Sequence, residues 1–288
     1  MFVVLGATGN TGSIVADRLL AAGKQVRVLV RDAAKAAALS ARGAEMQVGA
    51  IESVADLTTA LKGAEGAYLL VPPDGTSTAF LARGARITDA MKQALEATAV
   101  PHVVLLSSVG AEVPSGTGPI GVVHHAEQVL GALPNTKLTA LRAAYFMENL
   151  LGLLHPMKAE GVLPAFSKSL DYAFPMIATR DIGETAARAL LEPPTESQVI
   201  ELSGSKEASF ADAAAAFGAA LGRPVQAVSV PYEGIVPALT AVGLSEHMAG
   251  LYREMSEAFD AGKCTFSGKH RTVRGAIDVA AFARAAVA

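Results

Sequence analysis

The sequence of 288 residues predicts an α/β fold in which a doubly wound parallel sheet is joined to a smaller, mainly helical lobe. In the first half, short apolar runs alternate with longer amphipathic segments, which is typical of right-handed β-α-β units. The apolar runs are continuous rather than alternating, and this indicates strands that are buried on both faces. After Arg142 the alternation gives way to a loop-rich stretch. We therefore expect a first domain over 1–150 and a lobe over 151–288, with 178–203 returning to pack on the first domain.

The strands of the first domain are expected at the apolar runs Phe2–Leu5, Gln25–Val30, Glu45–Val48, Ala67–Val71, Val103–Ser107 and Leu138–Arg142. The helices between them are expected at Thr11–Ala22, Ala34–Ala41, Val54–Leu61, Ala79–Ala97 and His125–Leu133.

Further elements are expected after the loop-rich stretch. A helix begins near Asp181, which can cap it together with Glu184 three residues later, and ends before Pro193. It is followed by strand Val199–Leu202, helix Phe210–Leu221 and strand Val225–Val230, and then by helical patterns up to the C-terminus.

Charge and cysteine content limit the class of protein. The 24 basic and 27 acidic residues give a net charge of −3, which does not favour direct binding of nucleic acid or an anionic membrane. The single cysteine, Cys264, excludes an internal disulfide and is expected to be a structural residue. The start "MFVVLG" has no basic segment typical of a signal peptide, and no apolar run reaches 18 residues. We expect a soluble cytoplasmic protein, for which a homodimer stays open.

The segment "GATGNTG" joins the first strand to the first helix. Gly6 would allow a tight turn, Gly9 would let the backbone approach a pyrophosphate, and Gly12 would let helix and strand pack closely. The phosphates would lie at the helix N-terminus, where free N–H groups favour anions. A purely structural turn is the alternative, but strand, loop, helix and second strand follow in the order that favours a Rossmann dinucleotide site.

The residues after the second strand indicate which dinucleotide is bound. A carboxylate there would hold the ribose 2′-hydroxyl of NAD, whereas this chain has Arg31, followed by Asp32 and Lys35. Arg31 can pair with a 2′-phosphate in a fork, and Lys35 adds a second positive charge. Alternatively both are simply solvated while Asp32 caps the next helix. We expect NADP, with NADPH preferred over NADH.

Several segments resemble the NmrA-like family of atypical short-chain dehydrogenases: "GATGNTG", "LVRDAAKAAAL", "LLVPP", "VVLLSSVG", "LRAAYFMENLL" and "TRDIGETAARAL". The family includes NADPH-dependent quinone reductases of the second type, dye reductases and co-regulators that bind the dinucleotide without turning it over. The resemblance and the loop together give the expected cofactor-binding residues Gly6, Thr8, Gly9, Asn10, Thr11, Gly12, Arg31, Lys35, Val71, Pro72 and Ser107.

Two positions depart from the family pattern. The family commonly has Gly-Asp after the third strand, where its Asp meets the adenine amino group, and this chain has Gly49 and Ala50, so that contact is lost unless Glu52 provides it. The family usually has Leu-Arg-Pro after the sixth strand, and this chain has Leu141, Arg142 and Ala143 there, so the proline is missing.

The segment "GVVHHAEQVL" stands where an ordinary short-chain dehydrogenase has Tyr-x-x-x-Lys, the pair that moves a proton to or from the substrate oxygen. Its absence disfavours alcohol oxidation, epimerisation and, because the Lys is missing, an isoflavone-type reductase. Quinone reduction does not need that acid, because a weak donor or water can protonate a hydroquinone anion. His124 or His125 can serve as the donor. Alternatively, both histidines only cap the helix or lie on its surface, and Glu127 is a solvated charge.

The expected catalytic residues are therefore His124, Ser107 and Tyr145, with no metal site. An aromatic wall against a flat substrate is expected from Phe166, Tyr172 and Phe174, unless these only hold the lobe together. We expect an NADPH-dependent reductase that transfers hydride directly to a quinone or a similar flat electrophile. The competing hypothesis is a non-catalytic NADP(H)-sensing regulatory protein of the NmrA type.

Overall fold

The computed structural model describes residues 1–288. A central sheet of eight strands has the order β13-β10-β6-β5-β4-β1-β2-β3, and every neighbouring pair in it is parallel. The strand order reverses between β1 and β4, which makes the ends of these two strands the topological switch point where ligands bind in open α/β sheets. The sheet confirms the predicted doubly wound Rossmann architecture.

The first six strands of the sheet are β1 (Phe2–Leu5), β2 (Val26–Val30), β3 (Glu45–Val48), β4 (Gly66–Leu69), β5 (His102–Ser108) and β6 (Lys137–Ala143). The helical elements between them are α1 (Asn10–Ala21), η1 (Ala33–Ala36), α2 (Ala37–Ala41), α3 (Val54–Leu61), α4 (Phe80–Thr98), η2 (Gly118–Ile120) and α5 (Gly121–Gly131). All eleven strands and helices predicted for the first domain are present, within a few residues at their ends.

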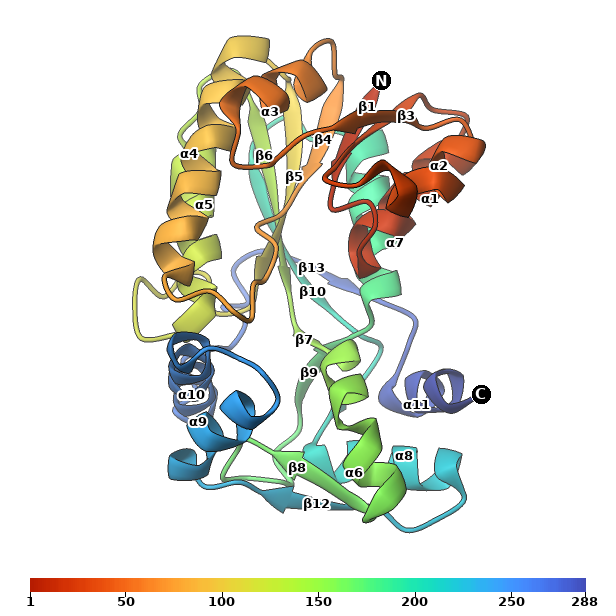
Figure 1. Cartoon of the computed structure of the whole chain (residues 1–288), viewed down its shortest axis with the longest axis vertical. Helices are drawn as coiled ribbons and strands as arrows, with labels where there is room; N and C mark the ends of the chain where they lie inside the picture. The colour runs from red at the N-terminus through yellow and green to blue at the C-terminus, as the bar shows by residue number, and fades with distance from the viewer.

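Helices cover both faces of the sheet (Figure 1). On one face α1, α2 and α7 (Thr179–Leu191) contribute to an apolar core of 23 buried residues. On the other, α3, α4 and α5 contribute to a core of 22. Successive residues of a strand point to opposite faces, so continuous apolar strands such as β1 serve both cores at once.

A lobe lies beyond the carboxyl ends of the central strands (Figure 1). Its helices are η3 (Met147–Leu153), α6 (Leu154–Ala159), α8 (Phe210–Leu221), α9 (Tyr232–Ala241), α10 (Glu246–Asp260) and α11 (Val279–Val287). Its short strands form two small sheets: β7 (Tyr145–Phe146), β9 (Phe174–Ile177) and β11 (Glu207–Ala208) in one, and β8 (Val162–Ala165) and β12 (Gln226–Ser229) in the other. A core of 15 buried residues holds the lobe together.

The chain passes between the two halves repeatedly. After the first part of the lobe it returns through α7 to β10 (Gln198–Ser203), which pairs with β6. After α10 it returns again to form β13 (Arg271–Arg274), the edge strand beside β10. The expectation of helix throughout the C-terminal segment is wrong here, because "RTVR" becomes a strand only through its pairing with β10.

The start of α7 also differs from the prediction. The helix begins at Thr179, and its first N–H is bonded by the carboxylate of Glu148, which comes from η3. Asp181 is not the cap: its carboxylate lies inward and accepts the backbone N–H of Ile277 at 3.0 Å. Glu184 pairs with Arg18 and Arg180 instead of completing a capping box. A distant carboxylate has replaced the local cap.

Candidate functional site

The glycine loop turns where β1 ends. Gly6 has a φ of +64°, and a Cβ there would lie 2.8 Å from the Leu70 side chain. At Gly12 a Cβ would lie 2.3 Å from the carbonyl oxygen of Gly6, so that only glycine lets the first turn of α1 approach the loop this closely. At Gly9 the same contact would be 3.3 Å, which leaves that backbone open toward the outside. The three glycines therefore form a turn whose outer side is bare backbone.

Helix α1 is held in place by β4 and by α7. The hydroxyl of Thr11 is buried and accepts a hydrogen bond of 2.9 Å from Tyr68 in β4. Burial raises the pKa of Tyr68, so this hydroxyl remains a donor. Gly183 of α7 brings that helix against Ile14 and the Thr11 backbone, where a Cβ would be 2.6–2.9 Å away. The Thr11 side chain thus positions the loop from beneath rather than pointing out of it.

The N-terminus of α1 has no capping side chain. Helices α3, α8 and α10 are each capped by a serine, namely Ser53, Ser209 and Ser245. In α1 the corresponding residue is Gly9, and Thr8, Gly9 and Asn10 are exposed. Unsatisfied N–H groups and the positive end of the helix dipole face outward here, which is the chemistry that binds a phosphate. The loop therefore fits the diphosphate of a dinucleotide.

The cations predicted to select NADP follow β2. Arg31 and Lys35 are both exposed and make no ion pair or hydrogen bond within the protein. Asp32 caps η1 by accepting the Ala34 N–H at 2.9 Å, as expected. Arg31 lies near Asp74, whose pKa is lowered first by hydrogen bonds from Thr76 and further by the charges of Arg83 and Arg31. The positive charges thus lie beside the glycine loop, on the side of β2.

In the turn after β3, where the family commonly has an aspartate, a carboxylate from α3 binds the backbone instead. Asp56 of α3 accepts the Ala50 N–H at 2.9 Å and its side chain covers Gly49, where a Cβ would lie 2.8 Å from Asp56. Glu52 pairs with Arg83 of α4 at 2.7 Å. The Glu52 carboxylate, which is the expected substitute for the adenine contact, therefore already has an ion-pair partner in Arg83.

Val71 and Pro72 follow β4 and are half-buried. Val71 packs against the small apolar cluster of Phe80, Val122, Met248 and Leu251, which joins α4 and α5 to α10 of the lobe. The end of β4 is thus held at the junction of the two halves.

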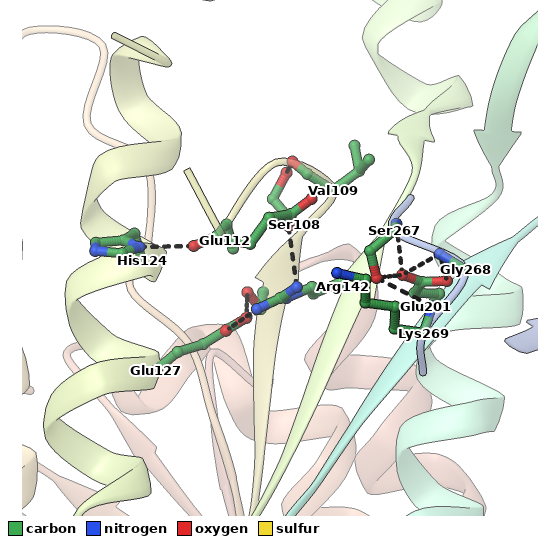
Figure 2. Close-up of polar contacts among 12 residues, drawn as sticks. Ser108, Val109, Glu112, His124, Glu127, Arg142, Glu201, Ser267, Gly268 and Lys269 are labelled. Atoms are coloured by element: carbon green, nitrogen blue, oxygen red, sulfur yellow. Dashed lines mark hydrogen bonds and ion pairs between the residues drawn. The ribbon is translucent and has the colours of Figure 1, made fainter. Parts of the chain in front are cut away.

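A buried ionic cluster lies below the end of β5 (Figure 2). The Ser107 hydroxyl donates a hydrogen bond to Glu127 of α5, and Ser107 is only 3% exposed. Arg142 of β6 donates to both oxygens of the same carboxylate, from Nε at 3.1 Å and from Nη2 at 2.7 Å. Glu127 is 8% exposed, so the interpretation of this residue as a solvated charge is wrong. A buried carboxylate is stable here because a guanidinium fork and a hydroxyl satisfy it.

Arg142 connects this cluster to the loop that follows β5. Its Nη1 donates to Glu112 at 3.0 Å. Burial by itself lowers the pKa of Arg142, but the hydrogen bonds and charges of Glu127 and Glu112 more than offset this and raise it. In the sheet, Arg142 lies between Ser107 on β5 and Glu201 on β10, which holds the backbone of Ser267 and Gly268. The guanidinium of Arg142 therefore joins β6 to α5 and to the loop after β5.

His124 is one turn before Glu127 on α5 but has a different neighbour. Its Nδ1 lies 2.7 Å from the carbonyl oxygen of Ala111, in the same loop as Glu112 (Figure 2). Since a carbonyl only accepts, Nδ1 carries the proton and the other ring nitrogen is left free. His124 and Arg142 thus hold the loop after β5 by two successive residues.

Tyr145 lies at the base of the lobe, in an aromatic cluster. Its ring meets Phe174 edge-on at 5.6 Å and Phe210 at 6.0 Å between centroids. Burial raises the pKa of Tyr145 to about 12, with the Asn149 side chain opposing it, so the hydroxyl keeps its proton at neutral pH. Of the expected aromatic wall, Phe174 belongs to the lobe core and Tyr172 is 63% exposed. The alternative interpretation, that these rings hold the lobe together, applies to Phe174.

The predicted residues thus fall into separate groups along one edge of the sheet. The glycine loop, Arg31 and Lys35 lie at the ends of β1 and β2. The three expected catalytic residues, Ser107, His124 and Tyr145, are not hydrogen-bonded to one another. The ion pairs of Arg142 with Glu127 and Glu112 are not among the features expected from the sequence. An arginine at the end of an otherwise apolar buried strand was the available signal, because such a charge requires a carboxylate nearby.

A polar groove of about 520 Å³ opens on the α5 side of β6 and β10. Its lining includes the apolar residues Leu138, Ala140 and Val199 and the polar residues Glu127, Arg142, Lys269 and His270. No three of the His, Cys, Asp and Glu side chains gather in the way that a metal ion requires. None of the helices combines the length and apolarity needed to cross a bilayer.

A parallel sheet with a bare glycine loop and an uncapped helix at its switch point defines a protein of the Rossmann class. The sequence profile of the NmrA-like family matches residues 1–280, and the chain belongs to this family.

Similar proteins include enzymes named as reductases. The NAD(P)H azoreductase of Xenophilus azovorans is 32% identical over 259 residues, which cover 88% of this chain and 86% of that protein. Quinone oxidoreductase 2 of Escherichia coli strain K12 is 26% identical over 255 residues, covering 87% and 85%. A solved structure of an NADPH-dependent quinone oxidoreductase from Escherichia coli in complex with NADPH has a TM-score of 0.81 and 25% identity, and the match covers 98% of both chains.

Proposed function

We propose that this protein is an NADPH-dependent reductase that transfers hydride directly to a quinone or a similar flat electrophile. The observation that carries the proposal is the uncapped N-terminus of α1 beside a glycine turn that tolerates no Cβ at Gly12. The names of the similar proteins, an azoreductase and a quinone oxidoreductase, support the same class of reaction.

Each part of the site has a defined role in this proposal. The N–H groups at Asn10 and Thr11 bind the diphosphate, and Arg31 and Lys35 attract the 2′-phosphate. Bound NADPH supplies the hydride, so that no flavin is needed. The substrate would lie between the end of β5 and the lobe.

The chain's own groups then manage the proton. Tyr145 keeps its hydroxyl proton at neutral pH and can donate a hydrogen bond to a substrate oxygen that gains charge. Because Nδ1 of His124 carries the ring proton, its free nitrogen is an acceptor, so His124 can serve only by orienting a water molecule that donates the proton. A hydroquinone anion is stabilised by its own ring, so a weak donor or water is sufficient.

The test is to follow the loss of reduced-nicotinamide absorbance with a panel of small quinones, using NADPH and NADH in parallel. We expect turnover that prefers NADPH, and a loss of that preference in Arg31→Ala. Arg42→Ala is the matched control, because Arg42 is equally exposed and pairs only with Asp17 on the surface. Turnover with equal preference for both cofactors would contradict the role of Arg31.

The competing function is an NADP(H) sensor that binds the dinucleotide without turning it over. Binding of NADPH, measured by fluorescence in the same sample, together with no oxidation by any quinone or azo dye, would favour this function and reject the reductase for those substrates.

A further inference from the structure

The cluster around Glu127 is placed to organise one half of the cleft and not the other. Ser107 is the penultimate residue of β5, and the following loop supplies Ala111 and Glu112, which are held by His124 and Arg142. The adenosine side of the proposed cofactor site, by contrast, is formed by the glycine loop and Arg31, which share no hydrogen bond or ion pair with this cluster.

Three contacts converge on one carboxylate. Glu127 receives the Ser107 hydroxyl and both Nε and Nη2 of Arg142, whose remaining Nη1 reaches Glu112. The Ser107 proton is therefore committed to Glu127, and Ser107 retains only acceptor capacity. The orientation of Glu127 thus fixes the Ser107 side chain directly and the β5 loop through Arg142.

We propose that Glu127 is a positioning residue for the nicotinamide half of the bound cofactor, acting through Ser107 and through the Arg142–Glu112 pair. This inference rests on the proposed function, because it assumes a dinucleotide whose nicotinamide lies at the end of β5. Glu127 itself touches neither hydride nor substrate. It keeps the strand end and its loop in the geometry that receives the nicotinamide, and it makes Ser107 an acceptor rather than a proton donor.

A dinucleotide binds through its adenosine half and its nicotinamide half, and the contribution of each half to affinity can be measured separately. NADPH spans both halves, whereas 2′-phospho-ADP-ribose carries the adenosine half and the diphosphate but no nicotinamide. A residue that only stabilises the fold affects both ligands alike. A residue that positions the nicotinamide half weakens NADPH selectively, so the ratio of the two dissociation constants is the readout.

The main variant is Glu127→Gln, measured by calorimetry or fluorescence with both ligands. We expect the affinity for NADPH to fall about tenfold more than that for 2′-phospho-ADP-ribose, which corresponds to about 1.4 kcal/mol. Glu201→Gln is the matched control: Glu201 is 2% exposed and lies across the sheet from Arg142, but it holds Ser267 and Gly268 instead of the β5 loop. We expect this control to lose stability without changing the ratio.

Ser107→Ala tests the same connection if Glu127→Gln folds poorly, because it leaves the Arg142 pair intact. It should shift the ratio in the same direction. Where Glu127→Gln folds, adding it to Ser107→Ala should shift the ratio less than Glu127→Gln does alone. An unchanged ratio in both variants, or an equal shift in Glu201→Gln, would overturn the proposal. If the wild-type protein binds NADPH but reduces no quinone, the reductase function is rejected, whereas the ratio of dissociation constants still tests the role of Glu127.

Discussion

The two ends of the site use their polar and charged groups in opposite ways. At the end of β1 the glycine loop offers exposed backbone N–H groups and side chains that make no ion pair, so its chemistry is available before any ligand arrives. At the end of β5 the charges of Glu127 and Arg142 are buried and already satisfied by each other. The first end is built to bind, and the second to hold a shape.

The largest expected effect is on the buried end. Arg142→Met removes the guanidinium and leaves the Glu127 carboxylate buried with only the Ser107 hydroxyl. We expect a loss of about 3 kcal/mol or more in the free energy of unfolding, measured with urea. Arg42→Met breaks an exposed pair with Asp17 and should cost less than about 1 kcal/mol. Equal losses in the two variants would show that the buried cluster is not special.

The next effect concerns the bare loop. Gly12→Ala places a Cβ 2.3 Å from the Gly6 carbonyl oxygen, so the loop must open. We expect NADPH binding to weaken about 100-fold, or about 2.7 kcal/mol. In Gly9→Ala the corresponding distance is 3.3 Å, and the loss should be clearly smaller. A larger loss in Gly9→Ala would mean that approach of the ligand, rather than packing of α1, sets the need for glycine.

The opposite end of β5 shows what burial does to a group without a counter-charge. His102 is 2% exposed and its Nε2 lies 3.0 Å from the Thr139 hydroxyl. Burial, and then the charge of Lys137, lower the pKa of His102 to about 4. The unfolded chain therefore takes up this proton below about pH 6.5, while the folded protein does so only near pH 4.

Stability from His102 is thus fully present above about pH 7 and is lost as the pH falls from about 6.5 towards 4. Between pH 7.5 and pH 5 we expect the wild type to lose about 1–2 kcal/mol more than His102→Gln, measured by urea unfolding at both values. Parallel pH profiles of the two proteins would contradict a neutral buried His102.

The smallest expected effect is at the exposed cation Lys35. Lys35→Ala should weaken NADPH binding about threefold, or about 0.7 kcal/mol, because an exposed charge is screened by water and salt. The difference from wild type should shrink further when the salt concentration is raised to 0.5 M, which is readily measured by fluorescence titration. A difference that persists at high salt would mean that Lys35 makes a direct, desolvated contact.

The same contrast explains what the sequence predicted. The strands, helices and glycine turn of the first domain depend on local patterns, and they are found where those patterns predict them. The Asp32 cap is equally local. The strand β13, the cap of α7 by Glu148 and the ion pair of Glu127 with Arg142 each depend on residues far apart in sequence. Periodicity does not contain that information.

Residue chemistry narrows this gap only in part. An arginine near the end of a buried strand, such as Arg142, indicates that a carboxylate is close. Glu112, Glu127 and Glu201 are all candidates from the sequence. Only the fold determines that Glu127 accepts both hydrogen bonds from Nε and Nη2. Phe174 is a similar case, because an aromatic residue in a loop-rich stretch serves a cleft or a core equally well until its partners are known.

The late position of β13 in the chain has a consequence for synthesis. The sheet gains its edge strand only from residues 271–274, so a nascent chain presents the unpaired side of β10 until these residues have left the ribosome. An unpaired strand edge is a template for association with other chains. Premature termination before residue 271 would therefore give fragments that tend to aggregate, because the β10 edge stays unpaired in them.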